Sequence, residues 1–433
     1  MKRLAFFAAV ALAFLAGLTV DHAVAAAARP GTYRSLDVFA RALAVIQGGY
    51  VDQVDDRELV QGAIEGMVAR LDAHSAYLRP EVFKAMREET AGEFDGVGVE
   101  VARAPGGLTV VSPVADSPGE RAGLRPGDRI LSIDGASTAD MSVPEATRRM
   151  KGAVGSRVEL ELMRDGFTAP QRLALVRERV RTRSVEWRVL DADRRLLYVR
   201  VKSFQDRTDA YLAKALGEGR EALKGELRGL VLDLRNNPGG LVEQAVLVAD
   251  RFLPRGVIVS TEGRDRESVE VRRAHEGGTE PAYPIILLVN RGTASASEIV
   301  AGALQDQGRA VIMGTQTFGK GSVQELIPLD DGSGLKLTVA RYYTPRHRSI
   351  QELGITPDVR VGEAAPAARA DDQPAERDLD RHLRNPEPAV ATPAQPPAEA
   401  TDHQLRTALD YLRAADILRN PGAPADGAAT RRD

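Results

Sequence analysis

The sequence predicts a multidomain α/β protein, because the hydrophobic pattern of the chain changes character three times. Apolar residues recur at helical spacing over about residues 32–92. Short alternating strands separated by glycine turns follow over residues 93–178. From residue 179 to residue 362, buried strands alternate with helical stretches, which is typical of an α/β domain with a central sheet. We therefore expect a helical N-terminal region, a small β-rich domain, an α/β core and a C-terminal tail.

The composition excludes several classes of function. The 433 residues leave room for about three domains. The 58 basic and 61 acidic side chains nearly balance, so no nucleic-acid partner is expected. The chain has six histidines without a metal-ligand spacing and no cysteine. We therefore expect no disulfide, no metal and no cofactor.

The first 25 residues have the pattern of a signal peptide. Lys2 and Arg3 precede an apolar run over residues 4–20, and Ala23-Val24-Ala25 forms a small-x-small cleavage site. The run is shorter than the ~20 apolar residues that a spanning helix needs, so we expect cleavage. The prediction is export, to the periplasm if the source is a Gram-negative bacterium. The alternative is an uncleaved segment that anchors the protein to the inner membrane, which is the one membrane contact expected.

The helical region over residues 32–92 carries two apolar groups. The first contains Val38, Leu43, Val45 and Ile46; the second contains Leu59, Ile64, Met67, Val68 and Leu71. Such a helical pair either packs only on the core, completing the 179–362 domain, or also joins a second copy or an adaptor protein. The sequence leaves these alternatives open.

The β-rich stretch over residues 93–178 resembles a PDZ domain. It contains a glycine loop, a strand that ends in an Asp-Gly turn, and a helix over residues 143–150. The resemblance implies that a peptide C-terminus adds as a strand beside that loop, whose amides hold the carboxylate. The peptide-binding residues implied are Gly96, Val97, Gly98 and Val99 in the loop, and Val143, Ala146 and Met150 on the helix.

The core contains a strand, a glycine turn and a helix in succession. Residues 229–234 are a buried strand, the turn ends in Pro238-Gly239-Gly240, and a helical stretch follows. This arrangement presents backbone amides to an anion. We expect Gly239 or Gly240 to supply one donor of an oxyanion hole, and the amide of Ala296, at the start of another helix, to supply the second.

Ser295 and Lys320 form the simplest nucleophilic site that this sequence can build. No histidine lies between Gly292 and Gln324, so a lysine is the nearest available base. A lysine accepts a proton only when neutral, and burial among apolar neighbours lowers its pKa toward that state. Ser297 fits a capping role at the same helix start.

Several motifs in a fixed order resemble the carboxy-terminal processing proteases, a family of tail-specific serine peptidases. The matching residues are 71–77 (LDAHSAY), 96–99 (GVGV), 233–240 (DLRNNPGG), 295–299 (SASEI), 318–324 (FGKGSVQ), 342–345 (YYTP) and 348–351 (RSIQ). The resemblance implies Ser295 as nucleophile, Lys320 as general base and Gln324 as the group that orients the lysine. It also implies protein substrates that are cleaved near a free C-terminus.

Three qualifications accompany this hypothesis. Arg346-His347 departs from the small or glycine-containing pair that the family often has there, which leaves the dyad intact. The alternative function is a catalytically silent scaffold that binds partners through the PDZ domain. Residues 314–320 approach a phosphate-binding loop, but Gly321 follows the lysine where Ser or Thr would hold magnesium, so no nucleotide is expected.

The residues after the core predict a tail with one short helix. Residues 363–401 are rich in Ala, Pro and charge, which is typical of a disordered linker. Residues 402–418 have an amphipathic helical pattern that could dock or dimerise, and residues 419–433 are expected to be disordered.

Overall fold

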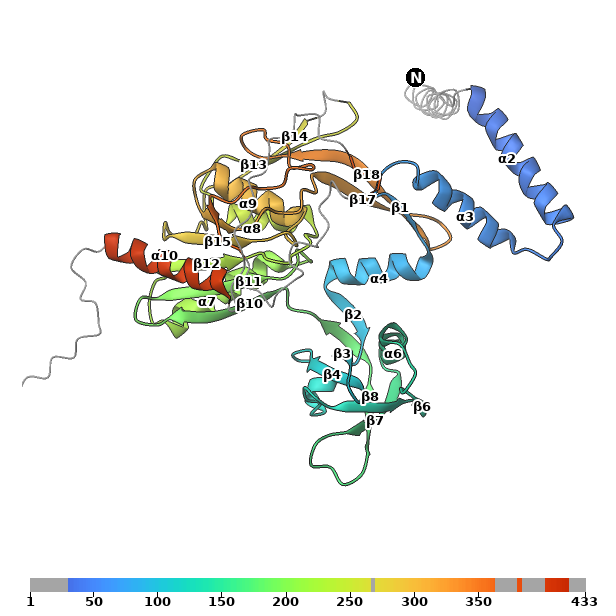
Figure 1. The fold of residues 1–433 in the computed structure, drawn as a ribbon, viewed down its shortest axis with the longest axis horizontal. Coiled ribbons are helices and arrows are strands. Elements are labelled where there is room, and N and C mark those ends of the chain that lie inside the picture. Colours follow the sequence, from blue (N-terminus) through green and yellow to red (C-terminus); the bar gives the residue numbers. More distant parts are fainter. Residues whose placement is uncertain (1–29, 266–268, 363–379, 384–401, 420–433) are drawn as a thin grey trace, which may run out of the picture. The chain divides into compact units, whose positions relative to one another are not determined.

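The computed structural model describes residues 30–265, 269–362, 380–383 and 402–419 (Figure 1). The predicted signal peptide, the linker apart from residues 380–383, and the stretch after residue 419 lie outside the described residues. The chain divides into two compact units, residues 1–70 and residues 71–433.

The first unit contains two described helices, α2 (Pro30–Gly49) and α3 (Asp56–Val68). Asp55 caps α3, because its side chain accepts hydrogen bonds from the amides of Arg57 and Glu58. Large apolar side chains on α2 are exposed, including Leu36, Val38, Phe39, Val45 and Ile46. Self-association through this region stays a prediction. No helix among the described residues is long and apolar enough to cross a membrane.

In the second unit, residues 99–176 form the β-rich domain. Its sheet has the order β3-β4-β5-β7-β8, with β6 paired to β5. The strands are β3 (Val99–Ala104), β4 (Gly107–Pro113), β5 (Arg129–Ile133), β6 (Ala136–Ser137), β7 (Arg157–Met163) and β8 (Gln171–Val176). Two helices, α5 (Pro118–Arg121) and α6 (Val143–Met150), complete it. Leu108, Ile133, Ala146 and Leu160 are fully buried in its core.

A two-stranded ribbon joins this domain to the rest of the unit. The helix α4 (Pro80–Ala91) leads into β2 (Glu93–Gly96), which pairs antiparallel with β9 (Glu178–Arg181). The chain therefore enters and leaves the β-rich domain through neighbouring strands, and the domain is an insertion between segments of the core.

The core is built on a six-stranded sheet of order β10-β11-β12-β15-β16-β19. All neighbours are parallel except β10 and β11. The strands are β10 (Val185–Asp191), β11 (Leu196–Val201), β12 (Gly229–Asp233), β15 (Ile285–Val289), β16 (Val311–Gly314) and β19 (Val359–Arg360). The strands β12 and β15 are buried on both faces, and their sequences are therefore nearly continuous apolar runs.

Helices cover both faces of this sheet (Figure 1). The helices α7 (Thr208–Ala222), α8 (Val242–Asp250) and α9 (Ala296–Asp306) share one hydrophobic cluster with alternate strand residues, such as Leu232 and Leu287. The helix α10 (His403–Arg419) packs on the other face, where Ala408 and Leu412 meet the intervening residues. The core is therefore a three-layer α/β/α domain, and the predicted C-terminal helix is docked on its sheet.

A second, wholly antiparallel sheet extends the core beside the central sheet. Its order is β1-β18-β13-β14, and β17 pairs with β18. The strands are β1 (Ala76–Leu78), β13 (Val257–Glu262), β14 (Val269–Arg273), β17 (Ser322–Pro328) and β18 (Gly334–Tyr343). The region predicted as helical over residues 32–92 thus includes a strand, because residues 76–78 pair with residues 334–336 far along the chain.

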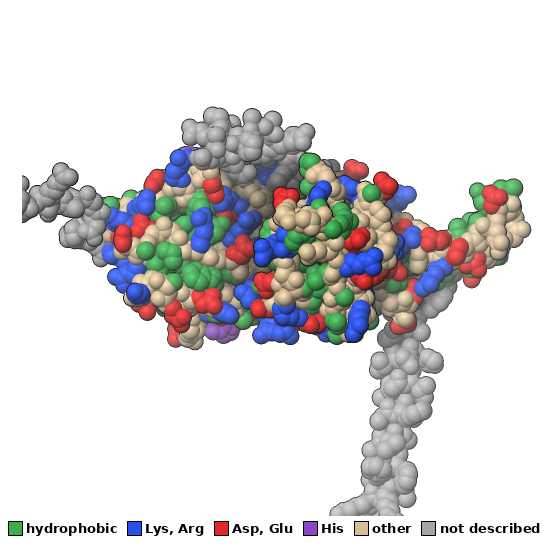
Figure 2. Space-filling model, turned by 90° about the horizontal axis from the view of Figure 1, so that it is seen from below, with side chains coloured by type: hydrophobic (Ala, Val, Ile, Leu, Met, Phe, Trp, Pro, Cys, Tyr) green, Lys and Arg blue, Asp and Glu red, His purple; other side chains and the backbone are tan. Residues whose placement is uncertain are grey.

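The surface agrees with the balanced composition. On the face drawn in Figure 2, acidic and basic side chains lie interspersed over the described residues, with no broad area of one sign. That distribution gives no electrostatic footprint for nucleic acid on this face.

Candidate functional site

Ser295 lies at the point where the chain turns from β15 into α9. Its backbone has φ 56° and ψ −117°, a combination that L residues rarely adopt. Such strain persists only where the surroundings hold it, and it is common at functional sites. Ser295 is the N-cap of α9. Among the described residues, the amide of Ala296 has no backbone acceptor, whereas the amides of Ser297 and Glu298 donate to the carbonyls of Ala294 and Ser295.

The buried carboxylate of Glu298 connects the Ser295 turn to the Lys320 loop. One of its oxygens, Oε2, accepts hydrogen bonds from the amide of Ser295 at 2.8 Å and the amide of Lys320 at 2.9 Å. The other oxygen, Oε1, accepts from the amide of Gly319 at 2.8 Å and from the hydroxyl of Thr317. A single carboxylate therefore fixes the backbone positions of both predicted catalytic residues.

The environment of Glu298 changes its protonation. The side chain is completely buried, and burial raises its pKa to about 7, although the hydrogen bonds from Thr317, Gly319, Ser295 and Lys320 oppose that rise. Four donors can be satisfied only by the ionised carboxylate, since a protonated carboxyl group gives up part of its acceptor capacity. Sequence reasoning missed Glu298, which lies in the first turn of α9.

The side chains of Ser295 and Lys320 are both shielded from solvent, to different degrees. Ser295 is 7% exposed, and the Lys320 side chain is half-buried. The Ser295 side chain is hydrogen-bonded to Tyr342, whose pKa is raised by burial and lowered in part by that bond. Tyr342 belongs to the YYTP motif, so the motif supplies a polar contact to the nucleophile that the sequence did not predict.

The glycine turn after β12 lies directly against the Ser295 turn. A Cβ atom on Gly239 would lie 2.8 Å from the carbonyl oxygen of Ala294 and 3.0 Å from the amide nitrogen of Ala296. The amide of Gly239 donates to Asn237 Oδ1 at 2.9 Å. Among the described residues, the amide of Gly240 has no acceptor. The two predicted oxyanion segments are therefore adjacent, and Gly240 has the amide that is free to bind an anion.

Ser297 has a different structural role from the predicted cap. Its side chain is fully buried, and its hydroxyl donates to the carbonyl of Asn237 at 3.0 Å. The amide of Ala294 donates to the same carbonyl. Ser297 therefore ties α9 to the glycine turn, which stabilises the spacing between the two oxyanion segments.

Gln324 lies on β17, where the pairing with β18 is interrupted by a bulge. Its side-chain nitrogen donates to Ser322 Oγ at 2.8 Å and approaches Thr338 Oγ1 at 3.4 Å. Thr338 in turn donates from its hydroxyl to Asp72 Oδ1 at 3.2 Å, and its amide donates to Ser75 Oγ. The LDAHSAY motif thus reaches Gln324 through Thr338, a connection that sequence reasoning missed.

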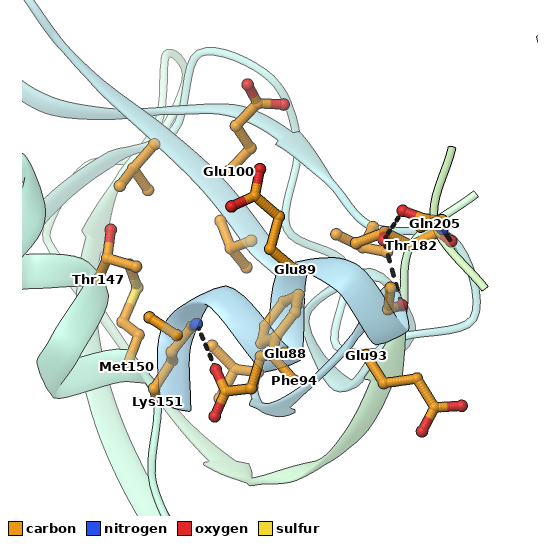
Figure 3. A pocket seen from close by; sticks show the side chains of 17 residues that line it. Glu88, Glu89, Glu93, Phe94, Glu100, Thr147, Met150, Lys151, Thr182 and Gln205 are labelled. Atoms are coloured by element: carbon orange, nitrogen blue, oxygen red, sulfur yellow. Dashed lines mark hydrogen bonds and ion pairs between the residues drawn. The ribbon is translucent and has the colours of Figure 1, made fainter. Parts of the chain in front are cut away.

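The β-rich domain contains a groove between its glycine loop, α6 and α4. The cavity has a volume of about 540 Å³, and Val97, Gly98, Val99 and Met150 line it (Figure 3). Among the described residues, the amide of Gly98 donates no backbone hydrogen bond although the residue is buried, whereas the bridge between Gly96 and Lys151 engages the amide of Val97. Buried amides are rarely left unpaired in native proteins. The loop therefore presents the Gly98 amide as a donor to an anion in the cavity.

The remaining predicted peptide-binding residues lie around this cavity without lining it. Ala146 is fully buried in the core of the β-rich domain, and Val143 packs against that core. Gly96 pairs with Lys151 as an isolated bridge beside the groove. The structure adds α4, which contributes Glu88 and Glu89 to the lining. No cluster of three potential metal ligands occurs among the described residues.

Comparison with known proteins identifies the three parts of the chain. The family model for peptidase family S41 matches residues 195–361, and a PDZ-domain model matches residues 109–164. A model described as the N-terminal domain of the activating protease CtpB matches residues 18–82.

Relatives match most of the chain. A carboxy-terminal-processing protease of Bartonella bacilliformis is 41% identical over 84% of this chain and 84% of its own length. The carboxy-terminal processing protease CtpA of Bacillus subtilis is 36% identical over 75% of this chain and 68% of its own. The solved structure of a photosystem II D1 C-terminal processing protease is 33% identical, with a TM-score of 0.43, over 75% of this chain and 92% of that one.

The chain belongs to the carboxy-terminal processing proteases of peptidase family S41. It is a serine-type peptidase with a PDZ domain and protein or peptide substrates. The predicted family, enzyme class and fold class are confirmed.

Proposed function

We propose that this protein is an exported endopeptidase that cleaves protein substrates near their C-termini with a Ser295–Lys320 dyad. The observation that carries the proposal is the shared carboxylate oxygen of Glu298, which holds the amides of Ser295 and Lys320. The shared hydrogen bonds to Glu298 hold the Ser295 turn and the Lys320 loop together, as is expected if both segments contribute to one catalytic site. The positive φ of Ser295 supports the same assignment.

In the proposed mechanism, Ser295 Oγ attacks the carbonyl carbon of the scissile peptide bond while neutral Lys320 takes the hydroxyl proton. The tetrahedral oxyanion is held by the amides of Ala296 and Gly240, since the amide of Gly239 is bonded to Asn237. Lys320 then gives its proton to the leaving amine, which leaves an acyl-enzyme on Ser295. A water molecule attacks this ester while Lys320 takes its proton. Lys320 returns the proton to Ser295 Oγ as the new C-terminal acid departs. Gln324 orients the lysine side chain.

The PDZ domain is proposed to recruit the substrate tail. The unpaired amide of Gly98 complements a free carboxylate, and the apolar side chains of Val97, Val99 and Met150 complement an apolar last residue. A peptide with a free C-terminus should bind roughly ten- to a hundredfold more tightly than its amidated form, because charge-assisted hydrogen bonds contribute about 1.5–3 kcal/mol. Equal affinities would show that the loop is structural.

The test of the dyad combines labelling with substitution. A fluorophosphonate probe should acylate the wild-type protein, and Ser295→Ala should abolish both labelling and peptide cleavage. Lys320→Met should abolish cleavage without unfolding, and combining the two changes should add nothing because both residues act in one step. Ser297→Ala, which removes the tie to Asn237 and keeps the nucleophile, should retain labelling. Labelling that survives Ser295→Ala would overturn the assignment.

Export is tested by processing of the N-terminal segment. We expect the mature protein, recovered from the periplasmic fraction of a Gram-negative host, to begin after Ala25 by N-terminal sequencing. Full-length protein that stays with the inner membrane would instead support the uncleaved anchor.

A further inference from the structure

The PDZ groove has an acidic side whose charges are not neutralised by the protein. We propose that this groove selects substrate tails with lysine or arginine at the residue before the C-terminal one, and that Glu89 and Glu100 bind that cation. The inference rests on the proposed function, since it takes the substrate carboxylate to be held at the glycine loop by the amide of Gly98.

The alternation of side chains along an added strand determines which substrate side chain faces which side of the groove. Successive side chains of a strand point to opposite faces. Along β3, Val101 is buried and Val99 packs against the domain core, whereas Glu100 between them is exposed. If the last substrate side chain points toward Met150 on α6, the one before it points away from α6, on the side of Glu100. Cross-strand neighbours lie ~4.5–5.5 Å apart between Cβ atoms, within reach of a lysine or arginine side chain.

The helix α4 brings a second carboxylate to the same cavity. Glu89 is exposed on α4 and lines the groove together with Glu100 (Figure 3). The helix α4 precedes the β-rich domain in the chain and is not part of its sheet. Glu89 therefore reaches the groove because of the way in which the domain is inserted into the core. A cation in the groove would therefore contact two carboxylates from two separate elements.

The other charges that line the groove are already paired. Lys151 Nζ lies 2.9 Å from Glu88 Oε2, and Arg181, which lies outside the lining, pairs with Glu93 at 2.7 Å. In Figure 3, Glu93 points away from Glu89 and Glu100. Among the described residues, Glu89 and Glu100 have no ion-pair partner, and Lys151 is the one basic residue in the lining. The groove therefore has an uncompensated negative charge where the penultimate side chain would lie.

The experiment measures binding with the full-length Ser295→Ala variant, in which the proposed nucleophile is absent and peptides are not consumed. Three fluorescent peptides share one sequence and a free C-terminal valine, and differ in having Lys, Gln or Glu before that valine. At low salt we expect the Lys peptide to bind about fivefold more tightly than the Gln peptide, and the Glu peptide to bind more weakly still. The preference should shrink as ionic strength rises.

Substitutions assign the preference to the two carboxylates. Glu89→Gln and Glu100→Gln should each reduce the ratio of Lys to Gln affinities, and the double variant should bring it to about one. Glu81→Gln is the matched control, because Glu81 is exposed on α4 but does not line the groove. Binding of the Gln peptide should stay unchanged in all variants. A wild-type ratio near one, or a Lys preference that survives the double substitution, overturns the inference.

The outcomes separate this inference from the proposed function. Failure of the dyad would appear as peptide cleavage that Ser295→Ala does not abolish, which is detected as consumption of all three peptides and not as a loss of the Lys preference. Failure of carboxylate recognition would appear as equal binding of the Gln peptide and its amidated form. If free termini are preferred and the penultimate residue has no effect, the PDZ groove recruits tails and only the cation site is wrong.

Discussion

At the scale of single residues, Glu298 is the feature on which the site depends most. Its carboxylate binds the amides of Ser295, Gly319 and Lys320, and burial raises its pKa to about 7. A carboxyl group with a raised pKa favours folding at low pH, and that contribution is lost as the pH rises from the ordinary value of 4.5 through about 7. The ionised form that the site requires therefore costs the fold some stability.

We predict that Glu298→Gln lowers kcat at least tenfold. The amide side chain cannot accept four hydrogen bonds, and a bond to a charged acceptor contributes about 1.5–3 kcal/mol, where ~1.4 kcal/mol is tenfold in rate. The measurement is kcat for a tail peptide, with Glu325→Gln as control because Glu325 is exposed on the neighbouring β17. Wild-type rates in Glu298→Gln would contradict the bridging role.

The pH dependence provides a second residue-scale prediction. As the pH falls through about 7, Glu298 takes up a proton, loses acceptor capacity and loosens the amides of Ser295 and Lys320. Wild-type kcat should therefore fall on the acid side of about pH 7, beyond the fall due to protonation of the lysine. The profile of Glu298→Gln should lack that component. Identical profiles for the two proteins would show that this carboxyl does not titrate in the active range.

At the scale of elements, the hairpin of β17 and β18 connects distant motifs. Burial would raise the pKa of Asp72, but hydrogen bonds from Ser75, His74 and Thr338 outweigh it and hold that pKa below its ordinary value. Asp72 is therefore a stable anion that anchors Thr338, and Thr338 lies beside the Gln324 amide. The element that carries Gln324 is thus positioned by residues near the start of the second unit.

We predict that Thr338→Val reduces kcat several-fold and leaves KM nearly unchanged. Valine keeps the shape and removes the hydroxyl that joins Asp72 to Gln324. Thr338→Ser, which keeps a hydroxyl, should restore most of the rate. Steady-state kinetics of both variants is the test, and a change confined to KM would argue for a substrate contact instead.

The helix α10 is held by packing as well as by ion pairs. Leu412 is buried between α10 and the sheet, and Asp416 binds Arg194 and Arg228. Leu412→Ala should destabilise the core by about 2–5 kcal/mol, as large-to-small changes in cores do. Tyr411→Ala, at a neighbouring position that is 48% exposed, should have a much smaller effect. Scanning calorimetry measures the difference, and equal shifts would mean that α10 is not part of the cooperative core.

The local patterns of the chain predicted its elements well, and the long-range contacts poorly. The helix over residues 143–150 and the strand at residues 229–234 were predictable because each has its own periodicity and turn signals. The pairing of Asp72 with Thr338, and the acidic wall that α4 adds to the groove, depend on tertiary placement that no local pattern encodes. Glu298 was missed because a cap and a bridging acid look the same in sequence.

At the scale of the whole molecule, the chemistry is expected to need no metal. Among the described residues, no three potential ligands cluster. Because the proposed dyad needs only a serine hydroxyl and a neutral lysine, peptide cleavage should survive prolonged treatment with EDTA at unchanged rate. Inactivation by EDTA that zinc reverses would show a metal-dependent step and contradict the serine mechanism.

The position of α10 has a consequence for the folding of the newly synthesised chain. The helix covers the side of the sheet formed by residues such as Val231, Leu288 and Met313, yet it is synthesised after every strand of that sheet. A nascent chain that lacks residues 402–419 has that apolar surface open to solvent, and Arg235, close before the glycine turn, lacks its partners Asp402 and Gln404. The core is therefore complete only after translation has passed Arg419.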